Sequence, residues 1–405
     1  MRLVSRNTTL SANRTTTTPK HTARTRAGEA MRIAHISDCY LPRTGGIETQ
    51  VRRLTQAELA AGLEPFVISA TPANENEISI PGETDNGVPI HRLAVRLPGD
   101  LPVTPHIGKR LREVLDGNCD VVHIHGGLIS PFAWPALRTA NKMELPAVVS
   151  VHSMWPQHAI TQKLMFPLRS LEHSNVVWST VSHAAVPAIQ GALGHDQQVY
   201  VLPNGIDVER WRDTNPVPEY QAGDPVTIVS VARLSHRKRM VPLVEMLAEA
   251  RRQVPPEIPM RALLIGQGSE RGKIERAIEK HELDWVELPG LQTQDQIRET
   301  YDTASMFVAS AVLESFGIAA LEARTAGMPV VGFAQSGVSE IVTDGQEGLL
   351  ASNDHEMAAA IARLTTDHAL RAKITRHNRE TVPPFSWPDC VAKATELYEL
   401  AISRT

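Results

Sequence analysis

The stretch that decides the fold of this chain is residues 32–62, "RIAHISDCYLPRTGGIETQVRRLTQAELAAG". Its first six residues form a short, mostly apolar run that is typical of a buried β-strand. After a turn that contains two glycines, residues 47–61 carry apolar side chains at the spacing of an amphipathic helix, and Gly62 follows as a helix-ending glycine. A strand, a turn and a helix in this order predict the first unit of a parallel α/β sheet.

The same alternation continues along the rest of the chain. Because short strands that alternate with helices are typical of parallel sheets covered on both faces, we expect two doubly wound parallel-sheet domains. In such sheets ligands bind beyond the carboxyl ends of the strands, so the two domains are expected to face each other across a cleft that holds the ligand. The further strand candidates are residues 65–70, 89–95, 120–126, 146–153, 175–183, 198–204, 225–234, 260–268, 285–290, 304–310, 328–334 and 347–352.

Composition narrows the class of protein. The 405 residues suffice for two domains, and a formal charge of -4 with 21% charged residues lacks the strongly basic character of a nucleic-acid binder. The three cysteines lie far apart without zinc-ligand spacing, as expected of reduced thiols in a cytoplasmic protein. No segment approaches the roughly 18 consecutive apolar residues of a membrane-spanning helix, so we expect no integral membrane protein.

The turn after the first strand contains Gly45 and Gly46, directly before the predicted helix. Glycines allow a backbone to approach a ligand closely, and the free N–H groups at a helix start attract anions. These features predict a phosphate or diphosphate contact, although a simple tight turn explains the two glycines equally well. The spacing is not that of a dinucleotide-binding or P-loop motif.

A basic cluster follows the strand candidate at 225–234, in residues 231–239, VARLSHRKR. The strand places Arg233 and Lys238 at the edge where a ligand between the domains is expected. A guanidinium binds a diphosphate through paired hydrogen bonds and an ammonium adds a compact charge, so the pair predicts a diphosphate site. The other three basic side chains of the cluster are expected to be solvated.

Two glutamates stand eight positions apart in residues 314–327, ESFGIAALEARTAG. Glu314 precedes a short predicted helix that begins after Gly317, and Glu322 lies in the second turn of that helix. Eight helical steps span about 12 Å, whereas the carboxylate pair of a retaining glycosidase is about 5 to 5.5 Å apart. Ionised carboxylates accept hydrogen bonds from hydroxyls, so the pair could hold the two sugar ends of a nucleoside diphosphate sugar. The alternative is a pair of surface glutamates on an amphipathic helix.

Residues 313–331, LESFGIAALEARTAGMPVV, closely resemble the E-x7-E segment of retaining nucleotide-sugar glycosyltransferases of the GT-B fold, in particular glycosyltransferase family 4. The resemblance extends over nearly all of the chain after Met31, and several motifs in the same order are far more specific than any one alone. It implies the GT-B architecture, in which two Rossmann-like domains face each other across a cleft. The other motifs are TGGIE, DVVHIHGG, VSVHS, VLPNGID, VARLSHRKR, LLIGQGSERGKIERA, SEIVTDGQEGLL and FSWPDCVAKATELYE.

The resemblance implies roles at the matching positions. Gly45 and Gly46 match the loop that closes over the donor diphosphate, and His152 in VSVHS matches the histidine near the donor sugar and the reaction centre. Arg233 and Lys238 match the pair that neutralises the leaving diphosphate. The expected catalytic residues are therefore His152, Arg233, Lys238 and Glu314.

Further donor contacts are implied in the second domain. Gly266 and Gly268 match residues that line the nucleotide pocket, Glu314 matches the residue that grips sugar hydroxyls, and Glu322 matches the ribose contact. Backbone contacts to the phosphates are implied for Phe316, Gly317 and Ile318. The chain departs from the family where Lys238 is followed by arginine instead of the frequent glycine, and it contains no D-x-D motif, so neither a metal ion nor a cofactor is expected.

The resemblance also sets the expected domain boundaries. Residues 1–30, rich in Thr and Arg, are expected to be a disordered tail or to result from the choice of start site. Residues 31–205 then form the acceptor-side domain, residues 206–385 the nucleotide-sugar-binding domain, and residues 386–405 a helix that crosses back to the first domain. The segment 204–225, rich in Pro, Asp and Asn, is expected to be a linker without regular structure.

The expected activity is a retaining transfer of a hexosyl group from GDP-mannose or a UDP-sugar to a hydroxyl of a glycan, lipid-linked or small-molecule acceptor. We expect a front-face mechanism, in which a donor phosphate oxygen takes the proton of the acceptor. Residues 161–173, TQKLMFPLRSLEH, could touch the inner face of a membrane, although an amphipathic core helix is the alternative. The other functions left open are a sugar-nucleotide epimerase or phosphorylase of the same fold, and a catalytically silent sugar-nucleotide-binding protein.

Overall fold

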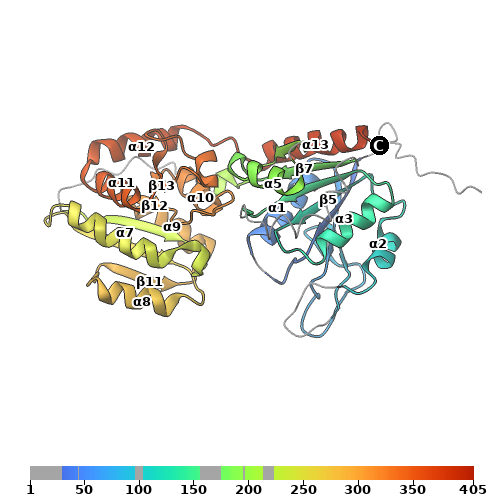
Figure 1. Ribbon diagram of the computed structural model, residues 1–405, viewed down its shortest axis with the longest axis horizontal. Coiled ribbons are helices and arrows are strands. Elements are labelled where there is room, and N and C mark those ends of the chain that lie inside the picture. Colours follow the sequence, from blue (N-terminus) through green and yellow to red (C-terminus); the bar gives the residue numbers. More distant parts are fainter. Residues whose placement is uncertain (1–29, 44, 96–103, 156–174, 195–196, 213–222) are drawn as a thin grey trace, which may run out of the picture.

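The computed structural model describes residues 30–43, 45–95, 104–155, 175–194, 197–212 and 223–405. These residues form two α/β units, each built around one sheet with helices packed on it (Figure 1). The N-terminal unit is blue to green in Figure 1, and the C-terminal unit is yellow to red apart from the last helix.

The N-terminal sheet has eight strands in the order β3-β4-β2-β1-β5-β6-β7-β8. All neighbouring strands are parallel except β3 and β4, which pair antiparallel at one edge. The strands are β1 (Arg32–Ser37), β2 (Glu64–Ser69), β3 (Thr84–Asp85), β4 (Val88–Arg92), β5 (Val121–Gly126), β6 (Ala147–Val151), β7 (Val176–Thr180) and β8 (Val199–Val201). The α-helices described in this unit are α1 (Gly46–Ala60), α2 (Ile107–Leu115), α3 (Ala133–Lys142) and α5 (Val186–Leu193).

The C-terminal sheet has six parallel strands in the order β11-β10-β9-β12-β13-β14. The strands are β9 (Val226–Val231), β10 (Met260–Ile265), β11 (Val286–Gly290), β12 (Met306–Val308), β13 (Val330–Phe333) and β14 (Gly348–Ala351). The helices are α7 (Met240–Gln253), α8 (Arg271–Lys280), α9 (Gln294–Thr303), α10 (Ile318–Thr325), α11 (Asp354–Thr366) and α12 (His368–Glu380).

The central strands are apolar because helices cover both faces of each sheet. In the N-terminal unit, Ile36 of β1, Ile124 of β5 and Val149 of β6 pack in one buried cluster with Ala136 and Leu137 of α3. Full burial of an aliphatic side chain contributes about 1.5 to 3 kcal/mol. The strands therefore hold a rigid sheet edge, from which the loops with polar side chains emerge.

The last helix, α13 (Trp387–Ser403), returns to the N-terminal unit, where it lies apart from the other red helices in Figure 1. Its Leu397 and Ala401 are buried against Val121 of β5 and Val177 of β7. The helix starts at a capping box in which the Ser386 side chain accepts from the Asp389 backbone N–H. The C-terminal residues thus complete the core of the first unit.

The structure confirms the predicted α/β class with two doubly wound parallel sheets, and each predicted strand overlaps an observed one. Two details differ. The sequence did not predict β3, because two residues are too short for a periodic pattern. The predicted linker contains a short helix, α6 (Val208–Trp211), because the Asp207 side chain accepts from the Arg210 backbone N–H and caps it.

Several predicted features fall on residues that the structure does not describe. These are residues 1–29 of the expected tail, residues 213–222 of the linker and the whole of segment 161–173. Among the described helices, none combines the length and the apolar character needed to cross a lipid bilayer.

Candidate functional site

A cavity of about 620 Å³ lies where strand ends of both sheets meet. Its lining comes from the loops after β1 and β6 in the N-terminal unit and after β9 and β12 in the C-terminal unit. This is the place that the rule for parallel sheets predicts. Most of the residues singled out in the sequence line this one cavity: Gly45, Gly46, His152, Arg233, Lys238, Glu314, Phe316, Gly317 and Ile318.

On the N-terminal side, Gly45 and Gly46 form the start of helix α1. Gly45 occupies the cap position without a side-chain capping bond. A Cβ atom on Gly45 would lie 2.5 Å from Oε2 of Glu48, so the Glu48 carboxylate is folded against the same turn. A carboxylate thus lies close to the helix start, where an anion was expected.

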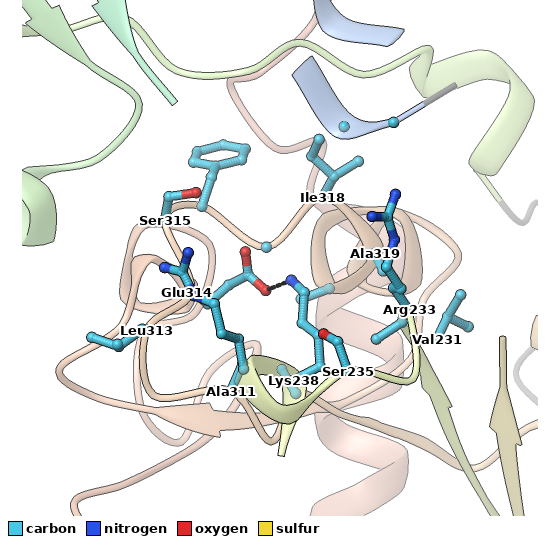
Figure 2. Close-up of a pocket in the computed structure, with 18 of the residues that line it drawn as sticks. Val231, Arg233, Ser235, Lys238, Ala311, Leu313, Glu314, Ser315, Ile318 and Ala319 are labelled. Atoms are coloured by element: carbon cyan, nitrogen blue, oxygen red, sulfur yellow. Dashed lines mark hydrogen bonds and ion pairs between the residues drawn. The ribbon is translucent and has the colours of Figure 1, made fainter. Parts of the chain in front are cut away.

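On the C-terminal side, Lys238 and Glu314 form an ion pair with Nζ 2.5 Å from Oε2 (Figure 2). Lys238 ends the short 3-10 helix His236–Lys238 after β9, and Glu314 belongs to the loop after β12. Both side chains keep part of their surface exposed to the cavity. The two oppositely charged groups that the sequence predicted for diphosphate and sugar thus neutralise each other in the free protein.

Arg233 lies beside this pair in the same cavity (Figure 2). Its side chain is exposed, and no ion pair to it occurs among the residues that the structure describes. Because its charge is not neutralised locally, Arg233 provides a free guanidinium for an anionic ligand.

Arg239, which replaces the frequent glycine of the family, adopts a left-handed backbone conformation with φ of 55°. Glycine reaches this conformation without strain, whereas other residues rarely adopt it. The Arg239 guanidinium compensates by pairing with Asp354 of α11 at 2.7 Å and by lying over the Phe333 ring, 5.5 Å from its centroid. The loop therefore keeps the backbone shape of a glycine turn and gains an anchor on the C-terminal unit.

The loop that carries Glu314 leads into helix α10 through Gly317, which has φ of 95°. Gly337 supports this loop, since a Cβ atom there would lie 2.3 Å from the Ser315 carbonyl oxygen. No side chain caps α10, and its first residues, Ile318 and Ala319, line the cavity. Free N–H groups at this helix start can bind a phosphate.

Three of the predicted residues, Gly266, Gly268 and Glu322, do not line the cavity. The two glycines have a steric reason to be present. A Cβ atom on Gly266 would lie 1.9 Å from the Ala232 carbonyl oxygen, and one on Gly268 would lie 2.2 Å from the Leu234 carbonyl oxygen. They allow the loop after β10 to lie directly against the loop that carries Arg233.

Glu322 lies in α10 close to Arg210 and Tyr301. Burial raises the pKa of its carboxyl to about 8, although the charge of Arg210 opposes the rise. The sequence predicts that Glu322 is an ionised acceptor. The structure differs, because in the free protein this carboxyl is mostly protonated at neutral pH.

His152 follows β6 and lines the cavity, and its Nε2 lies 3.0 Å from Nδ1 of His125. Burial lowers the pKa of His152 to about 4, so its imidazole is neutral at neutral pH. His125 in turn contacts His35, which pairs with Glu58. Neither His35 nor Glu58 is among the site residues predicted from the sequence. The available signal was the recurrence of histidine inside apolar strands, as in RIAHIS and DVVHIHG.

Comparison with known families covers most of the chain. The family model "Glycosyltransferase Family 4" matches residues 44–210, and the model "Glycosyl transferases group 1" matches residues 212–381. A phosphatidylinositol N-acetylglucosaminyltransferase subunit of Arabidopsis thaliana is 27% identical over 389 residues, which are 92% of this chain and 82% of that protein. Alpha-monoglucosyldiacylglycerol synthase of Acholeplasma laidlawii is 22% identical over 400 residues, which are 90% of this chain and 96% of that protein.

Solved structures show the same fold. Sucrose-phosphate synthase of Thermosynechococcus elongatus superposes with a TM-score of 0.72 at 20% identity, covering 93% of this chain and 100% of that one. The Anabaena protein HepE in complex with UDP superposes with a TM-score of 0.71 at 18% identity, covering 91% and 100%. These likenesses confirm the predicted GT-B architecture.

Proposed function

Because this chain belongs to glycosyltransferase family 4 and is a transferase that takes a sugar from a nucleotide sugar, we propose that it is a retaining hexosyltransferase. The donor is a nucleoside diphosphate hexose, and the acceptor is a hydroxyl of a glycan, a lipid-linked sugar or a small molecule. The observation that carries this proposal is the convergence of Arg233, Lys238 and the start of α10 on one side of the cavity.

The chemistry follows from where charge develops. Cleavage of the anomeric bond builds up negative charge on the β-phosphate. Preorganised cationic groups stabilise the transition state in which this charge develops. Arg233, Lys238 and the N–H groups at the start of α10 supply positive potential without a divalent ion. Activity is therefore expected to persist in EDTA, and abolition of turnover by EDTA would refute this part of the proposal.

Donor binding exchanges one ion pair for another. In the free protein Lys238 holds Glu314 at 2.5 Å. A diphosphate that enters the cavity competes for Lys238, which releases the Glu314 carboxylate to accept hydrogen bonds from sugar hydroxyls. In the empty site Lys238 and Glu314 thus neutralise each other, and they become two separate contacts once the donor is bound.

Retention of configuration follows from a front-face displacement in which a donor phosphate oxygen takes the acceptor proton. Glu314 is engaged in hydroxyl binding, and His152 is a neutral base with a pKa of about 4. No covalent sugar–enzyme bond is needed in this scheme. Product stereochemistry measured by NMR tests it, because an inverted product would rule it out.

The nucleotide base is open to direct measurement. The Anabaena neighbours were solved with UDP and with UDP-glucose, which makes UDP-sugars the first donors to test, with GDP-mannose as the alternative. Binding to the folded state raises stability with the logarithm of ligand concentration. We expect that, in the presence of EDTA, one of the two nucleotides, UDP or GDP, raises Tm and that the other does not.

The catalytic assignment is tested by comparing variants. Lys238→Ala is expected to lower kcat by about 100-fold, as loss of a transition-state charge contact does. Glu322→Ala, by contrast, is expected to raise donor KM with little effect on kcat. Lys273→Ala serves as the control, because Lys273 is an exposed residue of α8 that pairs with Glu270, directly before that helix. Equal effects of Lys238→Ala and Glu322→Ala on kcat would contradict the assignment.

The same assays separate the alternative functions. A glycosyltransferase is expected to hydrolyse its donor slowly when no acceptor is present, whereas a silent sugar-nucleotide-binding protein would bind the donor and leave it intact. An epimerase would convert the donor into a different nucleotide sugar. A phosphorylase would be active only with inorganic phosphate. The names of two relatives refer to phosphatidylinositol and to a diacylglycerol derivative, so a lipid-linked acceptor is the first class to test. Flotation with anionic liposomes is expected to show peripheral binding if the acceptor is a lipid.

A further inference from the structure

A row of four side chains runs from the core of the N-terminal unit to the cavity. Glu58 of α1 places Oε2 2.6 Å from Nε2 of His35, and both side chains are fully buried. His35 of β1 places Nδ1 3.0 Å from Nε2 of His125. His125 of β5 places Nδ1 3.0 Å from Nε2 of His152, which lines the cavity. The buried carboxylate is thereby connected to the cavity through three imidazoles.

Glu58 also anchors a second row, which stays inside the core. The Tyr398 hydroxyl of α13 donates to Oε1 of Glu58 at 2.7 Å. The Tyr398 oxygen lies 2.8 Å from Nδ1 of His123, whose Nε2 lies 2.8 Å from the Ser150 hydroxyl. The two carboxylate oxygens therefore have different partners, and only the row through His35 reaches the cavity.

Burial favours the neutral form of two imidazoles in this cluster, His123 and His125. Burial is the main reason that the pKa values of His123 and His125 lie well below the usual range, and neighbouring histidines add to the effect. The titratable groups that face the row are Glu58, Tyr398, Cys390 and the histidines themselves.

The three core histidines also place one ligand atom each within 4.8 Å of one another, as a metal site would. Their ring nitrogens, however, all have protein partners, in Glu58, Tyr398, Ser150 and the adjoining imidazoles. The cluster is therefore better described as a hydrogen-bonded row than as a metal site.

The carboxylate fixes the direction of the row. A carboxylate at Glu58 can only accept, which requires a proton on Nε2 of His35, 2.6 Å away. When His35 holds this single proton, its Nδ1 accepts from Nε2–H of His125. His125 then donates at Nε2 and accepts at Nδ1. The proton in the next hydrogen bond must therefore be on Nε2 of His152. The nitrogen left over, Nδ1 of His152, carries a lone pair and has no hydrogen-bond partner among the described residues.

We propose that Glu58, acting through His35 and His125, holds His152 as the Nε2–H tautomer, so that His152 offers a hydrogen-bond acceptor to a substrate hydroxyl in the cavity. Glu58 is thus a positioning residue located inside the core. The proposal depends on the proposed glycosyl transfer only for the identity of the hydroxyl. The tautomer itself can be measured without any substrate.

Long-range 1H–15N NMR correlation of the full chain labelled with 15N-histidine tests the direction. The signals of His152 are identified among the 16 histidines by their loss in His152→Gln. We expect a protonated Nε2 and an unprotonated Nδ1 in the wild type at neutral pH. A protonated Nδ1 would overturn the proposal even if the chain proves to be an active glycosyltransferase.

Three variants test the role of Glu58. Glu58→Gln retains an accepting oxygen and is expected to retain the single tautomer. Glu58→Met has a similar volume without an acceptor, so the His152 signals should divide between two tautomers and kcat should fall about fivefold, the equivalent of one neutral hydrogen bond. Tyr398→Phe alters only the second row and should leave the His152 tautomer unchanged.

An unchanged His152 spectrum in Glu58→Met would show that Glu58 does not set the tautomer. If Glu58→Met fails to fold, His35→Leu provides the second test, because it separates Glu58 from His125 and should give the same mixture. A His152 tautomer that stays single in His35→Leu would overturn the proposal, as would its loss in Tyr398→Phe.

Discussion

At the scale of single residues, the environment of Glu322 decides its chemistry. The carboxyl lies in α10 beside Tyr301, and burial raises its pKa to about 8. A protonated carboxyl both donates and accepts a hydrogen bond, whereas an ionised one only accepts. A ribose with two neighbouring hydroxyls can be bound by either form, so the ribose contact implied by the resemblance does not require the ionised state, although Glu322 does not line the cavity of the free protein.

The raised pKa predicts how stability depends on pH. The unfolded chain loses the Glu322 proton near its ordinary pKa of 4.5, while the folded chain keeps it up to about pH 8. Between these values the folded state binds more protons, so the free energy of unfolding falls as pH rises, by at most about 1.4 kcal/mol per pH unit. Glu322→Gln should remove this fall, and urea unfolding at pH 5 and pH 8 measures it.

The exposed Glu299→Gln on helix α9 is the matched control for that measurement. It should change the free energy of unfolding equally at both pH values. If Glu322→Gln also gave equal changes at pH 5 and pH 8, Glu322 would already be ionised in the folded protein.

The sequence could predict which residues meet at the site, but not how they pair. The strand before Arg233 and Lys238 predicts their place at the edge of the sheet, the E-x7-E resemblance predicts Glu314 at the same site, and all three line the cavity. Their pairing depends on side-chain geometry that no spacing encodes. Glu58 was missed because it is one polar residue of an amphipathic helix, and its partner Tyr398 lies 340 positions away.

At the scale of elements, the loop that carries Arg233 and Lys238 is held by the loop beside it. The loop after β9 and the loop after β10 are joined by backbone bonds from Ala232 N–H to the Ile265 carbonyl at 3.0 Å and from Leu234 N–H to the Gln267 carbonyl at 2.9 Å. Gly266 and Gly268 make this approach possible. The glycines expected to line a nucleotide pocket thus position Arg233 from behind.

Gly266→Ala tests this arrangement. The new Cβ atom would lie 1.9 Å from the Ala232 carbonyl oxygen, and φ of 141° disfavours any side chain. We expect a loss of at least about 2 kcal/mol in the free energy of unfolding, together with a lower kcat, because the loop that carries Arg233 must move.

Gly272→Ala in helix α8 is the matched control for this change. Its nearest neighbour would be the flexible end of Arg276 at 3.6 Å. Stability should stay the same or rise by up to about 1 kcal/mol, since alanine favours a helix over glycine. A harmless Gly266→Ala would show that the two loops do not depend on their close contact.

At the scale of the whole molecule, the chain passes between the two units twice, and the two connecting segments lie side by side. Ile206 on the way into the C-terminal unit forms a bridge with Ser386 on the way back, and its N–H donates to the Phe385 carbonyl at 2.8 Å. Gly205 lies so close to the Trp387 ring that a Cβ atom would be 2.4 Å from it. Helix α13 therefore belongs to the N-terminal core, although it is the last element of the chain.

This arrangement predicts which half of the molecule each core position stabilises. Leu397 of α13 is buried with Val121 and Val177 of the N-terminal sheet, while Leu364 of α11 is buried in the C-terminal core. Leu397→Ala should cost about 2 to 5 kcal/mol and lower only the thermal transition that UDP or GDP does not stabilise. Leu364→Ala should lower only the transition that the nucleotide does stabilise. Calorimetry with and without nucleotide distinguishes the two thermal transitions. If Leu397→Ala lowered the transition that the nucleotide stabilises, α13 would stabilise the C-terminal unit instead.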